Sequence, residues 1–201
     1  MRLGITTYCS IGHLSVKVNR KVVFRAADGS EDLLKLIYNQ LNPAYPKFFK
    51  MDDLCRLGFL GVEWIVKERP ELSESEDDAI ALVFQNEMSS LQSDSEHQLQ
   101  LNKGVASPAT FVYTLPNIVV GEIAIRNKWF GESAFFVGPK SDVAMLVDYT
   151  KSLILNRKAK IGIVGFIESF AGDHFLRLLV VEETNSGDEF NVVSLSKFIA
   201  E

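Results

Sequence analysis

Hydrophobic and polar positions follow two periods along the chain, and these periods predict strands that alternate with helices. Runs typical of strands occupy residues 3–11, 80–84, 134–137, 161–167 and 175–181. Apolar residues at helical spacing predict helices that start after Ser30, Asp52 and Thr114, and one from Ser141 to Asn156. Residues 191–201 fit either a strand or a helix. This order indicates an α/β domain with a mixed, mostly parallel sheet and helices on both faces.

Two segments interrupt this order. Residues 14–24 predict an inserted β-hairpin, because valines on both sides flank the turn-like pair Asn19-Arg20. Residues 86–105 are polar and predict a long loop with a helical piece. A loop of that length in a compact domain is often functional.

Composition narrows the classes of function. The chain has 201 residues, 47% of them hydrophobic, which predicts one globular domain over residues 1–201. A net charge of −5 argues against nucleic acid or an anionic membrane as the main partner. No apolar run approaches the roughly 20 residues that span a bilayer, and the first residues lack the apolar stretch of a signal peptide. Two cysteines are too few for a disulfide framework or a metal motif. We therefore expect a cytoplasmic protein with no metal and no cofactor.

One segment carries a specific resemblance. Residues 107–131 read SPATFVYTLPNIVVGEIAIRNKWFG. Ser-Pro, an aromatic residue, Leu-Pro-Asn, a Gly-Glu helix and a Gly before a strand resemble, in this order, the segment of β-ketoacyl (3-oxoacyl-carrier-protein) synthases that leads into the nucleophile strand. Residues 45–53, 80–93 and 161–168 are similar to other parts of the same family, which lies in the thiolase-like superfamily.

The resemblance implies a thiolase-like half-unit with the order βαβαβαββ. A full ketosynthase has two such half-units, and its second half supplies two histidines that act on the thioester. We expect that second half to be absent here. His13, His97 and His174 lie outside any matching family motif, so no family histidine carries over to this chain.

The resemblance also places Lys140 at about the position of the family's nucleophilic cysteine. A thiolate is favoured at a helix N-terminus, whereas an ammonium group is disfavoured there. The ketosynthase nucleophile is therefore missing, and no family catalytic residue can be assigned. Lys140 itself has two readings: a Schiff-base nucleophile, which requires burial and a lowered pKa, or an ordinary lysine in a Gly-Pro-Lys turn.

Asn117 and Glu122 belong to the Leu-Pro-Asn and Gly-Glu parts of the same segment. They are candidates to line a substrate groove. The alternative is structural, with Asn117 in the first turn of a helix and Glu122 paired with Arg126 at i,i+4 spacing. In this helix we expect Gly121 to pack closely against the sheet.

Two further groups carry candidate chemistry. Cys9 and His13 could form a nucleophile and its base, but Cys9 fits a buried inert thiol as well. Asp94, Glu96 and His97 could gather a metal ion, but their polar context also fits a solvated loop.

The strand formed by Ala134, Phe135, Phe136 and Val137 is, by resemblance, the one that pairs across a dimer two-fold; the alternative is an ordinary buried strand. Our first hypothesis is a catalytically inactive ketosynthase-like accessory or partner subunit in fatty-acid or polyketide-type synthesis. It would form a homodimer, or a heterodimer with a ketosynthase relative, and would contact an acyl carrier protein. The alternative is an acyltransferase or 3-oxoacyl synthase that uses another nucleophile or completes its site across a dimer.

Overall fold

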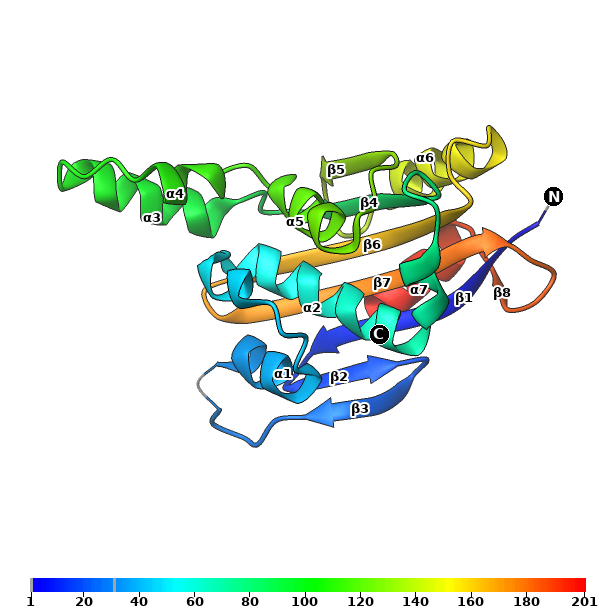
Figure 1. The fold of residues 1–201 in the computed structure, drawn as a ribbon, viewed down its shortest axis with the longest axis horizontal. Coiled ribbons are helices and arrows are strands. Elements are labelled where there is room, and N and C mark those ends of the chain that lie inside the picture. Colours follow the sequence, from blue (N-terminus) through cyan, green and yellow to red (C-terminus); the bar gives the residue numbers. More distant parts are fainter. Residues whose placement is uncertain (1, 31) are drawn as a thin grey trace.

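The structure is a computed structural model that describes residues 2–30 and 32–201. A single sheet forms its centre (Figure 1). Its strands lie in the order β3-β2-β1-β7-β6-β4-β5, and β8 pairs with β1. β4 pairs in parallel with β5 and β6, whereas β7 runs antiparallel between β6 and β1. β1, β4, β5 and β6 therefore all point the same way. The strands are β1 (Leu3–Gly12), β2 (Ser15–Val18), β3 (Lys21–Arg25), β4 (Ile80–Asn86), β5 (Ser133–Val137), β6 (Ile161–Phe170), β7 (Asp173–Glu183) and β8 (Asp188–Glu189).

Helices cover both faces of this sheet, which confirms the predicted α/β class (Figure 1). One face packs against α1 (Leu33–Leu41), α2 (Asp53–Glu68) and α5 (Ile118–Asn127). The other face packs against α6 (Ala144–Leu155) and α7 (Val192–Ala200). All seven residues of β4 are buried, because this strand lies inside the sheet with helices on each side.

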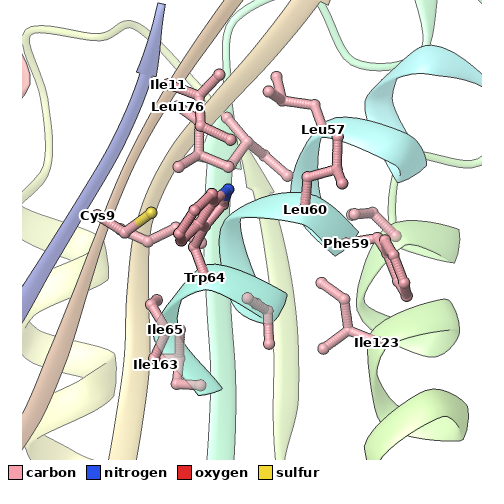
Figure 2. Packing of buried hydrophobic residues seen from close by; sticks show 14 of the residues in the cluster. Cys9, Ile11, Leu57, Phe59, Leu60, Trp64, Ile65, Ile123, Ile163 and Leu176 are labelled. Carbon is pink, nitrogen blue, oxygen red and sulfur yellow. The ribbon is translucent and has the colours of Figure 1, made fainter. Parts of the chain in front are cut away.

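The α2 helix lies over the middle of the first face, with the 3-10 helices η1 (Pro46–Lys50) and η2 (Pro70–Glu74) at its two ends. As predicted, Asp52 caps this helix: its Oδ1 accepts a hydrogen bond from the backbone N–H of Cys55 at 2.9 Å. The apolar face of α2 is thus covered within the chain. Figure 2 shows this packing, in which Leu57, Leu60 and Trp64 of α2 lie near Cys9, Ile11 and Leu176 of the sheet.

Close packing between elements depends on glycines other than the one expected. A Cβ added at Gly165 of β6 would lie 1.9 Å from the carbonyl oxygen of Arg177, on the neighbouring β7. A Cβ added at Gly61 of α2 would lie 2.5 Å from Leu176 Cδ1. Gly121 is different, because a Cβ there would meet nothing within 4 Å. The expectation that Gly121 packs closely against the sheet is wrong.

Three helices begin later than predicted. α1 is capped by Asp32, whose Oδ1 accepts from Lys35 N at 2.9 Å, while the Ser30 hydroxyl donates to the carbonyl of Ala27 in the preceding turn. α5 begins at Ile118, and the Thr114 hydroxyl donates instead to the carbonyl of Phe111. α6 begins at Ala144, since the residues from Pro139 to Asp142 form a turn of their own.

Two tight turns shape the antiparallel part of the sheet. The predicted hairpin is formed by β2 and β3, and Asn19 and Arg20 between them both have positive φ. β6 and β7 are joined by Ala171-Gly172 alone, so residues 168–174 are mostly strand rather than the predicted connection. The C-terminal segment, left open by its pattern, is the helix α7.

The helical piece predicted within the loop over residues 86–105 takes up most of that segment. Residues 91–102 form the helix α3 (Leu91–Asn102), and α4 (Pro108–Val112) follows it. Figure 1 shows α3 and α4 projecting beyond the end of the sheet. This projecting arm exposes several large apolar side chains: Leu91, Leu99, Leu101, Val105, Phe111, Val112 and Leu115.

Candidate functional site

The carboxyl ends of β4, β5 and β6 meet at one edge of the sheet. The connection from β4 to β5 runs through α5 on one face, and the connection from β5 to β6 runs through α6 on the other. In α/β sheets, ligands bind at the carboxyl edge where the connections diverge in this way. This edge carries Asn86, Glu87, Lys140 and Glu168. It is therefore the first place to look for chemistry.

Lys140, the residue at the expected nucleophile position, lies in the turn after β5. Its backbone N–H donates to Glu87 Oε1 at 2.7 Å. Its Nζ lies 3.3 Å from the centroid of the Phe175 ring, a close cation–π contact. Burial, together with the nearby Arg177 guanidinium, lowers the pKa of the Lys140 amine. Lys140 is thus half-buried and held by an aromatic ring, not an exposed turn lysine.

Arg177 lies beside it on β7 and is only 6% exposed. Its Nη1 donates to the carbonyl of Leu176 at 3.0 Å and to that of Ile11 at 3.5 Å. Its Cζ lies 4.3 Å from the Phe175 centroid. Among the described residues, no carboxylate lies within ion-pair distance of this guanidinium. A buried cation without a carboxylate partner is costly in a protein interior.

The carboxylates of Glu87 and Glu168 at this edge accept hydrogen bonds from backbone N–H groups. Glu168 Oε2 accepts from Glu87 N at 2.9 Å and from Met88 N at 3.1 Å, and Oε1 accepts from Asn86 Nδ2 at 3.3 Å. Burial raises the pKa of Glu168. Gln85 Nε2 donates to the carbonyls of Gly138, Pro139 and Asp142 and so holds the turn that carries Lys140. These contacts fix the loops after β4 and β5 in place.

A hollow of about 810 Å³ opens on the α2 side of the same edge. Its lining includes Asp32, Asp53, Asp173 and His174. His174 Nδ1 lies 3.0 Å from Ser169 Oγ, its cross-strand neighbour. Burial lowers the pKa of His174, although the three aspartates oppose this shift. The imidazole is therefore neutral at pH 7.

The half-buried His174 predicts a loss of stability in mild acid. Folding depresses its pKa, so below about pH 6.5 the unfolded chain binds a proton that the folded chain does not. The free energy of unfolding contributed by this residue should therefore fall as the pH drops from 7.5 to 5.5, by at most about 1.4 kcal/mol per pH unit. Urea unfolding of the wild type and of His174→Gln across this range measures the effect. A stability difference between the two that is constant with pH would contradict it.

Both cysteines are buried and unreactive. Cys9 is 0% and Cys55 is 2% exposed, and both belong to the core under α2. Burial raises the pKa of the Cys9 thiol to about 12 and that of Cys55 well above its usual value. Cys9 is therefore the buried inert thiol of the second interpretation. Neither thiol could serve as a thiolate nucleophile at neutral pH.

The other predicted candidates lie apart from one another. Asn117 is exposed at the start of α5, whereas Glu122 is buried and its Oε2 lies 2.6 Å from Lys47 Nζ. The predicted pair between Glu122 and Arg126 is wrong, because Arg126 Nε bonds Glu63 Oε1 at 2.9 Å. A groove role for Asn117 and Glu122 stays a prediction.

The acidic residues of α3 do not form a metal site. Asp94 and Glu96 lie near Ser90 and Gln92, and the His97 ring lies beside Phe111. Over residues 2–30 and 32–201, no group of three or more His, Cys, Asp or Glu side chains is placed to hold a metal ion.

Arg177 and Phe175 were missed by sequence reasoning. The signal was a single arginine inside the apolar run of residues 175–181. A charged side chain in a strand with both faces buried must find a special environment. Phe175 and Arg177 share one face of β7 at i,i+2 spacing, but the approach of Lys140 to the same ring could not be read from spacing, because it requires β5 and β7 to be placed in the sheet.

No protein-family model matches this chain, and no curated protein matches it. Solved structures do match. The ishigamide ketosynthase/chain length factor is 16% identical, with a TM-score of 0.67 over 94% of this chain and 64% of that one. The ketosynthase ApeO in complex with its chain length factor ApeC from Xenorhabdus doucetiae is 14% identical, with a TM-score of 0.62 over 92% of this chain and 80% of that one.

This chain has the ketosynthase fold. A type II polyketide synthase ketosynthase bound to a hexaketide, in complex with its acyl-carrier protein (AntDE:AntF), matches as well, at 12% identity and a TM-score of 0.64 over 90% of this chain and 62% of that one. The chain thus spans less than two thirds of the length of two of these three structures. The predicted thiolase-like fold is confirmed. Among the described residues, no helix is long and apolar enough to cross a membrane.

Proposed function

We propose that this chain is a non-catalytic, ketosynthase-like partner subunit in fatty-acid or polyketide-type synthesis. One observation carries the proposal: Lys140, not a thiol, lies at the carboxyl edge of β5, where the resemblance places the nucleophile. The two cysteines of the chain are buried in the core on the α2 side and hold their protons. The fold provides the scaffold of a ketosynthase without the group that forms the acyl-enzyme.

The edge strand β5 supports association. Within residues 2–30 and 32–201, β5 pairs with β4 on one side only, so its other side presents unpaired backbone groups. Matching solved structures contain a ketosynthase with its chain length factor. The projecting arm formed by α3 and α4 adds exposed apolar surface, which in soluble proteins marks an interaction site. We propose a homodimer, or a heterodimer with a ketosynthase relative, formed through β5.

The proposal predicts no decarboxylative condensation by the purified chain. The expected result is no 3-oxoacyl product and no release of carbon dioxide from malonyl carrier protein above the no-enzyme rate. No thiolate is available to carry the growing acyl group, and no family histidine carries over to assist decarboxylation. The measurement is a release assay with radiolabelled malonyl carrier protein, and an active ketosynthase serves as the positive control. Sustained formation of 3-oxoacyl product would contradict the proposal, and product formation that survives Cys9→Ala and Cys55→Ala would show that another residue of this chain is the nucleophile.

A second candidate function is acyl transfer through Lys140. The half-buried amine and its lowered pKa are the observation that favours it. The neutral amine would attack an acyl thioester, forming a C–N bond as the C–S bond breaks and the thiol leaves with a proton. Incubation with acyl-CoA followed by peptide mass mapping tests this. An adduct at Lys140 that is absent at the exposed Lys128 supports acyl transfer, and no adduct favours the partner subunit.

A further inference from the structure

We propose that Lys140 and Arg177 together hold an oxyanion, a carboxylate or a phosphate group, at the carboxyl edge of the sheet. This site does not depend on the partner function proposed above, and either can fail without the other. It rests on the way four side chains of the edge are arranged: Lys140, Phe175, Arg177 and Glu87.

The two cations are held against the same ring. Lys140 Nζ lies 3.3 Å and Arg177 Cζ lies 4.3 Å from the Phe175 centroid. Like charges near one ring repel each other, and the Arg177 charge lowers the pKa of the Lys140 amine. The contacts with the Phe175 ring offset part of this repulsion, and a bound anion would offset the rest.

Among the residues that the structure describes, the nearby carboxylates form no ion pair with either cation, although the charge of Glu87 raises the pKa of the Lys140 amine. Glu87 Oε1 accepts a hydrogen bond from the backbone N–H of Lys140 rather than from its ammonium group. Glu168 accepts from two backbone N–H groups of the loop after β4. Glu201 acts on Arg177 from a distance, and no ion pair joins the two in the described part of the chain.

The chemistry of the two side chains specifies the ligand. A guanidinium group presents parallel N–H donors that match the two oxygens of a carboxylate or phosphate, and an ammonium group adds a point charge. Arg177 Nη1 donates hydrogen bonds to two backbone carbonyls, and these bonds fix the plane of the guanidinium group. The site therefore offers a guanidinium group of fixed orientation and an ammonium group held over the same ring, a combination suited to one small anionic group.

The test titrates the full chain with inorganic phosphate and, separately, with malonate, against sodium chloride at matched ionic strength. Two readouts are used: the melting temperature, and the rate of reductive methylation of each lysine measured by peptide mass spectrometry. At ten times its Kd, a bound anion should slow methylation of Lys140 about tenfold. Lys128, which is exposed, is the internal control and should not change.

Arg177→Met is the matched variant. It replaces a buried cation with an apolar side chain of similar length, so it should fold with equal or higher stability in the absence of anion. It should lose the anion-dependent rise in melting temperature that the wild type shows. If Arg177→Met does not fold, Lys140→Gln, at a half-buried turn position, provides the same comparison through the melting temperature.

The outcomes separate cleanly. Protection by phosphate alone indicates a phosphate-bearing ligand, and protection by malonate alone indicates the carboxylate of an acyl group. Equal effects of both anions on the wild type and on the variant, or no protection of Lys140 beyond that given by sodium chloride, would overturn the site.

Discussion

Replacing Gly165 with alanine should destabilise this protein more than almost any other single-methyl addition, by about 3 kcal/mol or enough to prevent folding. The new Cβ would lie 1.9 Å from the carbonyl oxygen of Arg177, which belongs to the backbone of β7 and cannot rotate away. The two central strands would have to separate, and the ladder between β6 and β7 would be disturbed. Urea unfolding followed by circular dichroism measures the loss.

Gly121→Ala is the matched control. It adds the same methyl group to a helix where nothing lies within 4 Å of the new Cβ. Alanine is preferred over glycine inside helices by about 1 kcal/mol, so this variant should be neutral or more stable. Equal melting temperatures for the two variants would show that the close approach at Gly165 is not a constraint in solution.

Replacing Val137 with proline should weaken dimerisation about 100-fold if β5 is the subunit interface. Leu82 N donates to Glu132 O, and Gly138 N donates to Asn86 O. Because inward and outward groups alternate along a strand, the N–H groups of Ser133, Phe135 and Val137 point away from β4. Proline at position 137 removes one of these outward donors and none of the donors to β4.

In a two-fold dimer the substitution is made twice, so two intersubunit hydrogen bonds are lost, each worth about 1–1.5 kcal/mol. Val137→Thr keeps the N–H and the β-branched shape and should dimerise like the wild type. Sedimentation velocity at micromolar concentration reports both. A wild type that is monomeric under these conditions contradicts the homodimer.

Val137 is a better position for this test than its neighbours. Phe135 packs on the core beneath α2, and Phe136 packs on the core beneath α6. A lysine at either place would destabilise the subunit itself and would not report on the interface. Val137 is 56% exposed, so its side chain contributes little to folding.

The strands and the long apolar helices of this fold could be read from the sequence because burial imposes a pattern on them. The unbroken apolar run at residues 80–84 predicts a central strand, and β4 is buried throughout. Asp52 predicts a helix start, and it caps α2. Where both the local signal and the burial agree, the prediction holds.

The length of the helix α3 was underestimated, with only a helical piece expected, because it has no apolar face. Only Ser93 of its residues is buried. The helix is supported by hydrogen bonds between polar side chains, from Gln92 to Glu96 at 2.7 Å and from Gln98 to Asn102 at 3.0 Å. These polar positions give no hydrophobic period from which a helix could be predicted. A polar helix that projects from the sheet therefore looks like a loop in the sequence.

The side-chain partners of the site could not be predicted for a different reason. Glu122 and Arg126 have the right spacing to pair along a helix, but each lies closer to an opposite charge from another element. In the same way, Lys140 and Arg177 are distant in sequence and meet on Phe175 only in the folded sheet. Spacing identifies neighbours along one element, whereas these contacts are made between elements.

The pairing of β1 with β7 has a consequence for how this protein is made. Leu3 of β1 lies opposite Glu183 of β7. β1 therefore has no strand partner at this edge until β7, about 170 residues later in the sequence, has been synthesised. Of the strands that the structure describes, only the β2–β3 hairpin can pair with β1 before β7 has emerged, and the centre of the sheet cannot close until then. Contacts this distant in sequence fold slowly and leave apolar strands exposed meanwhile. Nascent chains that stop before β7 should therefore depend on chaperones, and chains that extend past it should not.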